Sequence, residues 1–466
     1  MKAVAVAATA LADVIKSGGY MNKTYCGACH GERGCPECKK AAKTAVYTGL
    51  TEFFTPKEIV HTDGTAEFRG ETAPGDKEAT LVLAVDLGTT TLAFVCADAS
   101  GTVSYGTENP QRIIAADVIG RVDAAMQGKR EQLQKMIREA LAKGFLFVLE
   151  KLCEERNRKM EEWRPEKVRI VVAGNTVMQH LLLGYPVDGF AKAPFRAYTT
   201  EKNEISCAGL FAECDQYAEF PKWLKQAGVT VFPCFAAFVG GDVTAGAYSV
   251  FPWAIQVRKG EETEVSAGEK QQDMRGQFPC LLLDLGTNGE LLLWNGKSLF
   301  GTAAAMGSAF EGGRFAYASE LFRLIAQGIR QEAVDETGLL SESYFLEGYE
   351  GVLQEDIREF QLAKGALRAG IELLSKKAEV PLSEISRIYI AGGVGRFCEV
   401  NDLFDTGLLP REFAGKVSFV GNSCIGGLLQ YWKDREPEIH ATGEMINLAE
   451  QPEFEELYYR YMNFER

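Results

Sequence analysis

Two aspartates each stand at the end of an apolar run and begin the same turn sequence. Asp86 lies in LVLAVDLGTTT (residues 81–91), and Asp284 lies in CLLLDLGTNGE (residues 280–290). A carboxylate at a strand end can hold Mg²⁺ through water, because this ion combines few carboxylates with phosphate oxygens. The glycine lets the backbone approach a phosphate, and Thr hydroxyls and turn N–H groups supply donors. One such turn is ordinary loop chemistry, but two of them predict a clamp for a phosphate-bearing ligand.

A third glycine-rich turn, IAGGVGR (residues 390–396), follows the apolar segment RIYI late in the chain. Small residues in such a turn let a flat base or a ribose lie against the backbone. Turns of this kind are common in any α/β fold. It becomes a candidate adenosine contact because it comes after the two DLGT turns.

Four cysteines lie close together near the start of the chain. Cys26, Cys29, Cys35 and Cys38 form a C-x₂-C-x₅-C-x₂-C arrangement. Four thiols at this spacing are rarely a packing accident, and they predict a metal centre. Both an iron–sulfur cluster and structural zinc use such ligands, although zinc pairs are usually further apart. The spacing alone leaves the two open.

The elements that position these residues alternate between strand-like and helix-like patterns from residue 80 onward, which predicts an α/β fold. Each DLGT turn is followed at once by a second apolar strand, so it joins antiparallel strands, unlike the strand-to-helix turn of a Walker A loop. Helices are expected over 130–160 and 355–377, and a solvent loop over 256–276. The expected strands are 81–85, 92–97, 168–173, 280–284, 290–294 and 387–391.

The length of 466 residues predicts several domains. We expect a Cys-bearing unit at 1–50, a linker at 51–79 that is polar and contains Gly and Pro, and two related lobes at 80–275 and 276–466. A net charge of −14 argues against nucleic acid or anionic lipid as the main partner. No apolar stretch reaches the roughly 18 residues that span a bilayer, so no membrane partner is expected.

The first residues, MKAVAVAATALADVIKSGG, could be a short signal peptide or a helix ending at Gly18-Gly19. We favour the helix, because the run is weakly hydrophobic and ligand-like cysteines follow it closely. Twelve cysteines without the density of a secreted disulfide scaffold indicate a reducing, cytoplasmic location.

The order of two DLGT turns and a later glycine turn resembles the superfamily of acetate and sugar kinases, heat-shock cognate ATPases and actin. The resemblance covers about 80–430 and implies ATP and Mg²⁺ in a cleft between two lobes. It implies that Asp86 and Asp284 organise the metal and the attacking nucleophile, and that Glu290 positions water through the metal. In the alternative interpretation, Glu290 is a solvent-exposed residue of the strand. The implied nucleotide contacts are Gly88, Thr89, Thr90, Gly286, Thr287, Asn288, Gly289, Gly392, Gly393 and Gly395.

Further segments resemble one branch of that superfamily, the reductive activators of corrinoid proteins. The family implies an α/β fold with two actin-like ATPase lobes of ribonuclease H-like type, preceded by a small, here shortened, ferredoxin-like Cys domain. The matching segments are Asn109-Pro110-Gln111, Ala116-Asp117-Val118, Gly174-Asn175-Thr176-Val177-Met178, residues 238–245, residues 284–290, Ala309-Phe310-Glu311-Gly312-Gly313, residues 361–366 and Gly421-Asn422-Ser423.

The resemblance also favours an iron–sulfur cluster over zinc, since Cys29, Cys35 and Cys38 fit the C-x₅-C-x₂-C pattern of the family's [2Fe–2S] domain. The usual fourth ligand lies further along, but the next cysteine here is Cys96, inside the first expected lobe, so Cys26 becomes the expected replacement. The cluster type, [2Fe–2S] or [4Fe–4S], stays open at this point.

The implied function is ATP-driven transfer of an electron from the cluster to an inactive Co(II) corrinoid protein, which regenerates Co(I) for methyl transfer. A corrinoid protein, an external electron donor and a second copy in a homodimer are the implied partners. Two alternatives remain: a small-molecule kinase with Asp242 or another cleft carboxylate as base, and a zinc or redox sensor switched by nucleotide.

Overall fold

The computed structural model describes residues 59–60, 66–67, 80–98, 101–255, 279–286, 288–307, 310, 315, 318–344, 348–396, 398–439 and 441–464. The cysteine unit expected at 1–50 and the loop expected at 256–276 lie outside these residues. Within 51–79 the structure describes two short strands, β1 (Ile59–Val60) and β2 (Ala66–Glu67), which pair antiparallel.

The first lobe is built on a six-stranded sheet with the order β5-β4-β3-β6-β8-β7. The first three strands in sequence are antiparallel neighbours, whereas β6 and β8 run parallel to β3, and β7 closes the far edge antiparallel to β8. The strands are β3 (Thr80–Leu87), β4 (Thr91–Asp98), β5 (Gly101–Glu108), β6 (Lys167–Gly174), β7 (Asn203–Ser206) and β8 (Gly228–Val231).

Five strands of a second six-stranded sheet repeat this plan; the order is β13-β12-β9-β10-β11-β14, and the sixth strand, β14, lies at the opposite edge, parallel to β11. Here β9, β10 and β11 form the antiparallel part, and β12 and β13 continue the sheet parallel to β9. Its strands are β9 (Cys280–Leu285), β10 (Asn288–Trp294), β11 (Leu299–Ala305), β12 (Arg387–Ala391), β13 (Val417–Gly421) and β14 (Glu444–Met445). The turn after Asp86 and the turn after Asp284 therefore occupy equivalent places in two copies of one topology.

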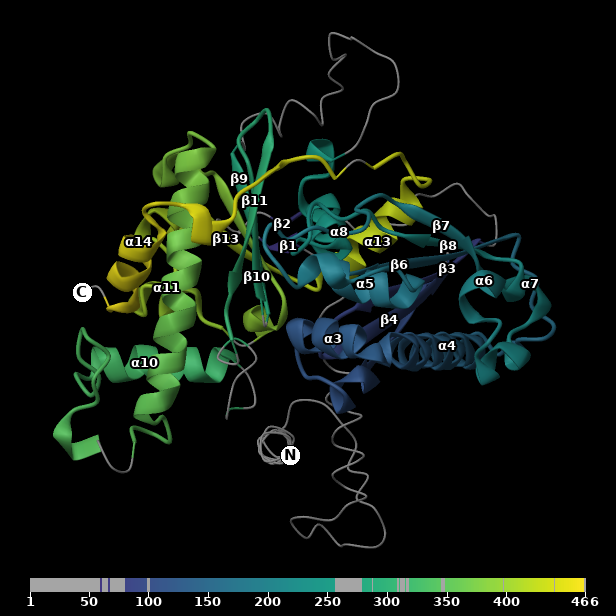
Figure 1. The fold of residues 1–466 in the computed structure, drawn as a ribbon, viewed down its shortest axis with the longest axis horizontal. Coiled ribbons are helices and arrows are strands. Elements are labelled where there is room, and N and C mark those ends of the chain that lie inside the picture. Colours follow the sequence, from purple (N-terminus) through teal and green to yellow (C-terminus); the bar gives the residue numbers. More distant parts are fainter. Residues whose placement is uncertain are drawn as a thin grey trace, which may run out of the picture.

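Alternation along the central strands separates the outer cores from the core between the lobes. In β3, Leu83 and Val85 face the outer helix α4 (Arg130–Glu155), while Val82 and Ala84 face the space between the sheets. On α4, the ring of Phe145 meets Phe94 of β4 edge to face at 5.5 Å between centroids. In the second lobe, α11 (Gln354–Lys377) covers the outer face of β10 and β11 (Figure 1).

Two helices fill the space between the sheets, α8 (Gly241–Val250) from the first lobe and α13 (Ser423–Lys433) from the second (Figure 1). Their backbones touch: a Cβ atom added to Gly427 would lie 1.7 Å from the carbonyl oxygen of Ala245. A Cβ atom on Gly246 would likewise lie 2.5 Å from Ser423 Oγ. Small residues at this crossing therefore hold the two lobes together.

The remaining helices lie around these layers. They are α3 (Val118–Ala124) with a π-helical continuation (Ala125–Lys129), α5 (Thr176–Leu183), α6 (Cys207–Phe211), α7 (Lys222–Lys225), α10 (Ala318–Arg330), α12 (Val400–Asp405) and α14 (Phe454–Met462). In the part of the chain that the structure describes, no helix is both long enough and apolar enough to cross a bilayer.

The expected strands are all confirmed, with one or two added residues at some ends. The helix expected over 355–377 is also confirmed as α11. The helix expected over 130–160 ends earlier, at Glu155, because Asn157 adopts a left-handed φ of 49° that a helix does not continue through. The predicted alternation of strands and helices thus gives the α/β fold.

Candidate nucleotide site between the two lobes

Three asparagine side chains converge on the first DLGT turn (residues 86–90). The donor–acceptor pairs are Asn422 Nδ2 to Asp86 Oδ2 at 2.7 Å, Asn109 Nδ2 to the Gly88 carbonyl oxygen at 2.8 Å, and Asn175 Nδ2 to Thr89 Oγ1 at 2.8 Å. The Oδ1 atom of each asparagine accepts a backbone N–H at the start of a helix. Each cap fixes the orientation of the amide, so the turn is held by three helix starts.

Arg121 of α3 is fully buried against the same turn. Its Nη2 donates to the carbonyl oxygen of Thr89 at 2.6 Å, its Nε donates to that of Ala115 at 3.2 Å, and its Nη1 lies 2.9 Å from the sulfur of Met178. Burial lowers the pKa of Arg121 to about 10, which leaves it charged at neutral pH. A fixed positive charge behind the turn favours an anionic ligand in front of it.

Four carboxyl groups from both lobes share the space in front of the turns: Asp86 of β3, Asp242 of α8, Asp284 of β9 and Glu290 of β10. Each side chain is half-buried. Loss of water raises the pKa of Asp86 to about 6, and loss of water together with neighbouring carboxylates raises that of Asp284 to about 7 and that of Asp242 to about 8. The same two causes raise the pKa of Glu290 well above its usual range. The groups therefore repel one another when ionised.

These carboxyl groups interact without forming a direct ligand shell. Among the described residues, no three His, Cys, Asp or Glu side chains are close enough together to hold a metal ion. A cation placed here would therefore be bound partly through water or through oxygens of a ligand, which is the usual behaviour of Mg²⁺. Such a cation would also relieve the repulsion that raises the pKa values.

The second DLGT turn (residues 284–289) places two of the carboxylates on one face. Glu290 lies directly opposite Asp284 in the antiparallel pair β9–β10, and directly opposed residues project from the same side of a sheet. The alternative in which Glu290 is an exposed strand residue is wrong, since Glu290 is half-buried. The amide of Gly286 donates to the carbonyl oxygen of Asn288 at 3.0 Å, which closes the turn. Thr287 lies outside the described residues.

The late glycine turn packs directly on the second DLGT turn. Gly392 has φ +88°, and a Cβ atom there would lie 2.4 Å from the carbonyl oxygen of Leu285 and 3.3 Å from Asp284 Oδ1. Only glycine combines this backbone conformation with such a close approach. Gly393 and Gly395 follow in a 3-10 turn, and Gly393 is exposed. The predicted base contact and the predicted phosphate contact are therefore neighbours.

Several residues of the site carried no predicted role. Asn175 and Asn422 come from the same three-residue pattern, Gly-Asn-Thr at 174–176 and Gly-Asn-Ser at 421–423, so this second internal repeat was available in the sequence. Arg121 had no such signal, because an arginine on a short helix usually faces solvent.

One motif of the family resemblance serves another purpose. Gln361 Nε2 donates to the carbonyl oxygens of Thr337 and Met462 at 2.9 Å each, and Lys364 Nζ donates to that of Asn463 at 2.6 Å. The segment 361–366 therefore fastens the end of α14 and the residue after it to α11.

Comparison with known proteins agrees with this architecture. A family model described as the RACo middle region matches residues 81–250, and a second one, the C-terminal ASKHA domain of RACo, matches residues 279–320 and 325–466. Together they span both sheets and all three turns of the site. This chain belongs to the RACo family. The ASKHA description also confirms the actin-like fold that the two equivalent sheets indicate.

Two known proteins extend the comparison. The chain is 26% identical over 447 residues to the corrinoid activation enzyme RamQ of Eubacterium limosum, covering 81% of this chain and 69% of RamQ. It also resembles the solved structure of a reductive activator for corrinoid, iron-sulfur protein, with a TM-score of 0.63 and 22% identity. That match covers 84% of this chain and 67% of the other and supports the fold.

The two RACo models leave the N-terminal part of the chain unmatched. Cys26, Cys29, Cys35 and Cys38 lie before residue 81, where the first match begins, and outside the described residues. The metal centre at these cysteines and the shortened ferredoxin-like domain stay predictions.

Proposed function

We propose that this RACo-family chain is an ATP-hydrolysing activase that reduces the Co(II) centre of a corrinoid protein to Co(I). The observation that carries the proposal is the joining of both lobes at one carboxylate, where Asn422 of the second lobe donates to Asp86 of the first. A ligand that competes for Asp86 acts on both lobes at once. Family membership and the similarity to RamQ support the corrinoid protein as the object of that action.

The residues present fit ATP with Mg²⁺. Hard oxygen donors, a buried cationic side chain and a glycine turn whose backbone a phosphate can approach are the partners that a metal–triphosphate needs. When bound, the metal would neutralise phosphate charge and favour the ionised carboxylates. Asp86, Asp284 and Glu290 are the side chains that would hold it, partly through water. Thr89, Thr90 and Asn288 of the two turns are proposed to contact the phosphates.

Asp242 is proposed to handle a proton. Its Oδ1 accepts the N–H of Val243 at 2.9 Å, which fixes the orientation of the carboxyl group. The pKa of about 8 makes this carboxyl a stronger base than an ordinary aspartate once it is ionised. Phosphoryl transfer to water depends mainly on positioning and electrostatics, so no covalent intermediate is required. ATP and water become ADP and phosphate.

The electron is separate from this hydrolysis. An iron–sulfur cluster at Cys26, Cys29, Cys35 and Cys38 would supply single electrons that an external donor replaces, and one electron converts Co(II) to Co(I). ATP binding favours one of two arrangements of the lobes over the other. To shift the ratio of their populations from 1:99 to 99:1, ATP must bind one arrangement about 5.5 kcal/mol more tightly than the other. The homodimer that the resemblance implies remains a prediction, and light scattering can test it.

The test is an anaerobic assay in which the chain, ATP and a reductant are mixed with a panel of corrinoid proteins in the Co(II) state. Growth of the Co(I) absorption band with one of them is the expected result. Asp86→Ala and Asp284→Ala should abolish both ATP turnover and reduction, while the exposed Glu355→Ala should change neither. Retained turnover in either Asp variant would refute the clamp.

The cofactor is tested separately by absorption and EPR spectra of the anaerobically purified chain. A brown protein with a reducible iron–sulfur signal is expected. A colourless protein with stoichiometric zinc would sink the electron-transfer role. A phosphorylated small molecule in place of free phosphate would instead support the kinase alternative.

A further inference from the structure

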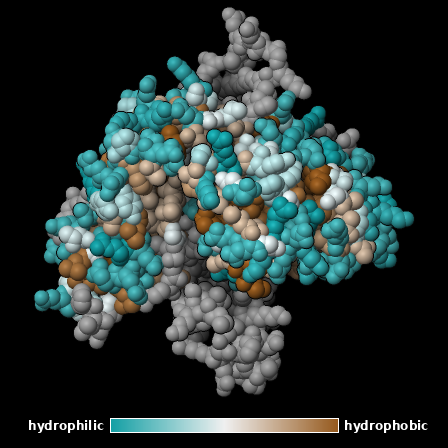
Figure 2. All heavy atoms as spheres, in the orientation of Figure 1, coloured by the Kyte–Doolittle hydropathy of each residue, from teal (hydrophilic) through white to brown (hydrophobic). Residues whose placement is uncertain are grey.

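Large apolar side chains are exposed on one side of the first lobe, around α3. Ile113 is 87% exposed, and Tyr198 is 66% exposed. We call the set the α3 face; its members are Ile113, Ile119, Met126, Phe195 and Tyr198, all exposed. α3 contacts both α5 and the 3-10 helix Asp188–Phe190, which precedes the loop that carries Phe195. Figure 2 shows hydrophobic residues at the surface near the position that α3 has in Figure 1.

The α3 face is attached to the first DLGT turn from within. Asn109 immediately precedes the 3-10 helix Pro110–Ile113, and its amide holds the carbonyl oxygen of Gly88. Arg121 lies two residues after Ile119, and its guanidinium holds the carbonyl oxygen of Thr89. The segment that carries Ile113 and Ile119 is therefore tied at both ends to the turn that is proposed to bind phosphate.

A second connection leads to Asp242. The ring of Phe195 packs against Phe238 at 5.1 Å between centroids, and Phe238 also contacts the buried ring of Phe190. Phe238 lies four residues before Asp242, in the loop that leads into α8. A shift of either nucleotide-contacting segment consequently moves side chains of the α3 face. A surface coupled in this way suits a partner whose binding must respond to ATP.

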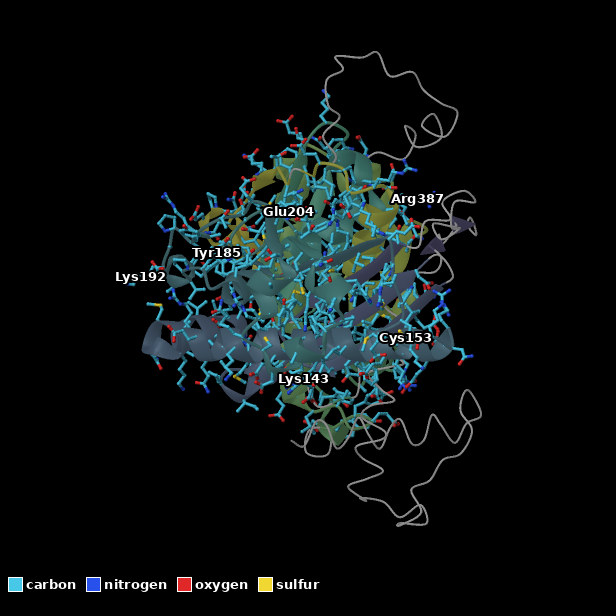
Figure 3. All side chains as sticks on the ribbon, turned by 90° about the vertical axis from the view of Figure 1, so that its right-hand side faces the viewer. Lys143, Cys153, Tyr185, Lys192, Glu204 and Arg387 are labelled. Carbon is cyan, nitrogen blue, oxygen red and sulfur yellow. The ribbon has the colours of Figure 1, made fainter. Side chains whose placement is uncertain are left out.

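Charge indicates the chemistry of that partner. The segment 189–200 contains Lys192 and Arg196 but no Asp or Glu, whereas Asp188 and Glu201 flank it and Asp117 and Asp123 are exposed on the α3 side. The side chains of Lys192 and Arg196 are both exposed, and Figure 3 shows Lys192 at the margin of the molecule. A protein surface with apolar side chains and with carboxylates opposite Lys192 and Arg196 is complementary.

We infer that the α3 face docks the corrinoid protein, through an apolar patch on that partner with acidic residues opposite Lys192 and Arg196. The inference rests on the proposed function and assigns it a surface. Nucleotide bound at the first DLGT turn changes the affinity of the α3 face for the corrinoid protein through Arg121 and Asn109. Docking changes the affinity for nucleotide by the same factor, because coupling between two binding sites is reciprocal.

The test uses the corrinoid protein that the wild-type chain reduces in the assay above. Binding is measured by calorimetry with a non-hydrolysable ATP analogue present, for the double variant Ile113→Ser/Ile119→Ser and for the charge reversal Lys192→Glu/Arg196→Glu. The matched control is Leu362→Ser/Tyr459→Ser, which removes two exposed apolar side chains from α11 and α14 of the other lobe. Thermal midpoint and partner-free ATP turnover are followed for all three.

The apolar double variant should weaken binding at least tenfold, with its thermal midpoint and partner-free ATP turnover unchanged. The charge reversal should slow association and reduce its dependence on salt, and the control should bind as the wild type does. Wild-type affinity in the apolar variant, or equal loss in the control, would overturn the inference while reduction by the wild type still stands. Failure of the wild type to reduce any corrinoid protein would overturn both.

Two further outcomes of the experiments would identify a different binding partner for the α3 face. A photoreactive residue at position 119 that cross-links within one chain to residues 1–58 would assign the α3 face to the chain's own N-terminal part. A dimer that the apolar variant converts to monomer, seen by light scattering, would assign it to a second copy. Either result would overturn docking of the corrinoid protein here.

Discussion

Asn422 Nδ2 donates a hydrogen bond of 2.7 Å to Asp86 Oδ2 and so connects the two lobes at the centre of the candidate site. Asn422 caps the start of α13, and Asp86 is the last residue but one of β3; the contact is possible because α13 packs against α8 and β3. The same asparagine caps α13 by accepting the N–H of Ile425. Its two roles, cap and donor, can be separated by mutation.

Asn422→Ala should lower ATP turnover about 10- to 100-fold, the value of a hydrogen bond to a charged group. The bond from Asn422 lowers the pKa of Asp86, so its loss raises that pKa, and the acid limb of the pH–rate profile should move to higher pH. Asn422→Ser keeps a capping oxygen. It should therefore lose turnover but retain more of the thermal stability, whereas alanine also loses about 1 kcal/mol of capping. An unchanged acid limb would contradict the contact.

Arg121→Met should destabilise the fold by roughly 1–3 kcal/mol, because the carbonyl oxygens of Thr89 and Ala115 lose a buried donor. It should also raise KM for ATP, since the charge behind the turn is removed. Urea unfolding and steady-state kinetics measure the two effects. The matched control is Arg112→Met, which breaks an exposed pair with Glu108 at 3.8 Å and should cost about 0–1 kcal/mol. Equal effects of the two substitutions would show that the buried contacts of Arg121 contribute no more than the exposed pair of Arg112.

Gly427→Ala should destabilise the protein by about 1–3 kcal/mol or more, because the new methyl group meets the carbonyl oxygen of Ala245 at the crossing of α8 and α13. Gly370→Ala in α11 is the control. Its Cβ atom would lie no closer than 3.5 Å to its neighbours, and alanine gains about 0.5–1 kcal/mol over glycine within a helix. The two substitutions should shift the urea midpoint in opposite directions. Stabilisation by Gly427→Ala would refute the close crossing.

Without nucleotide and metal, the stability of the protein should fall as pH rises toward 8. The pKa of Asp242 is about 8 in the folded chain against an ordinary value of 3.8, so its contribution is complete below about pH 4 and is lost as pH passes about 8. Asp242→Asn cannot ionise and should show a flatter profile in urea unfolding between pH 5 and 8, with about 1.4 kcal/mol at stake per pKa unit. The exposed Asp123→Asn should follow the wild type, and parallel profiles for all three would exclude Asp242 as the cause.

Much of the fold and part of the site follow from local sequence. The apolar runs before Asp86 and Asp284 are strands in the structure, and the hairpin after each turn is present because the next residues are again apolar. Glu290 could be placed near Asp284 because a tight turn sets them opposite each other. Such short-range relationships depend on periodicity alone.

Contacts between distant segments could not be obtained in this way. Asn422 lies 336 positions from Asp86, and only the packing of α13 against α8 brings them together. Arg121 is buried because α3 lies over α5, which its own short sequence does not reveal. The pattern Gly-Asn-Thr/Ser, repeated at 174–176 and 421–423, was the one local signal that could have indicated two of the asparagines.

The contact of Gly427 with Ala245 determines how the lobes can move. Because the backbones of α8 and α13 already touch, the helices cannot come closer at this point, which makes the contact a natural pivot between the lobes. The carboxylates lie near the starts of these helices, whereas Arg169 of β6 and Glu436, paired at 3.0 Å, join the lobes near the end of α13. A rotation of the lobes about this crossing that narrows the side of the carboxylates would widen the side of Arg169 and Glu436. Closure on a nucleotide by such a rotation would therefore loosen this distant ion pair.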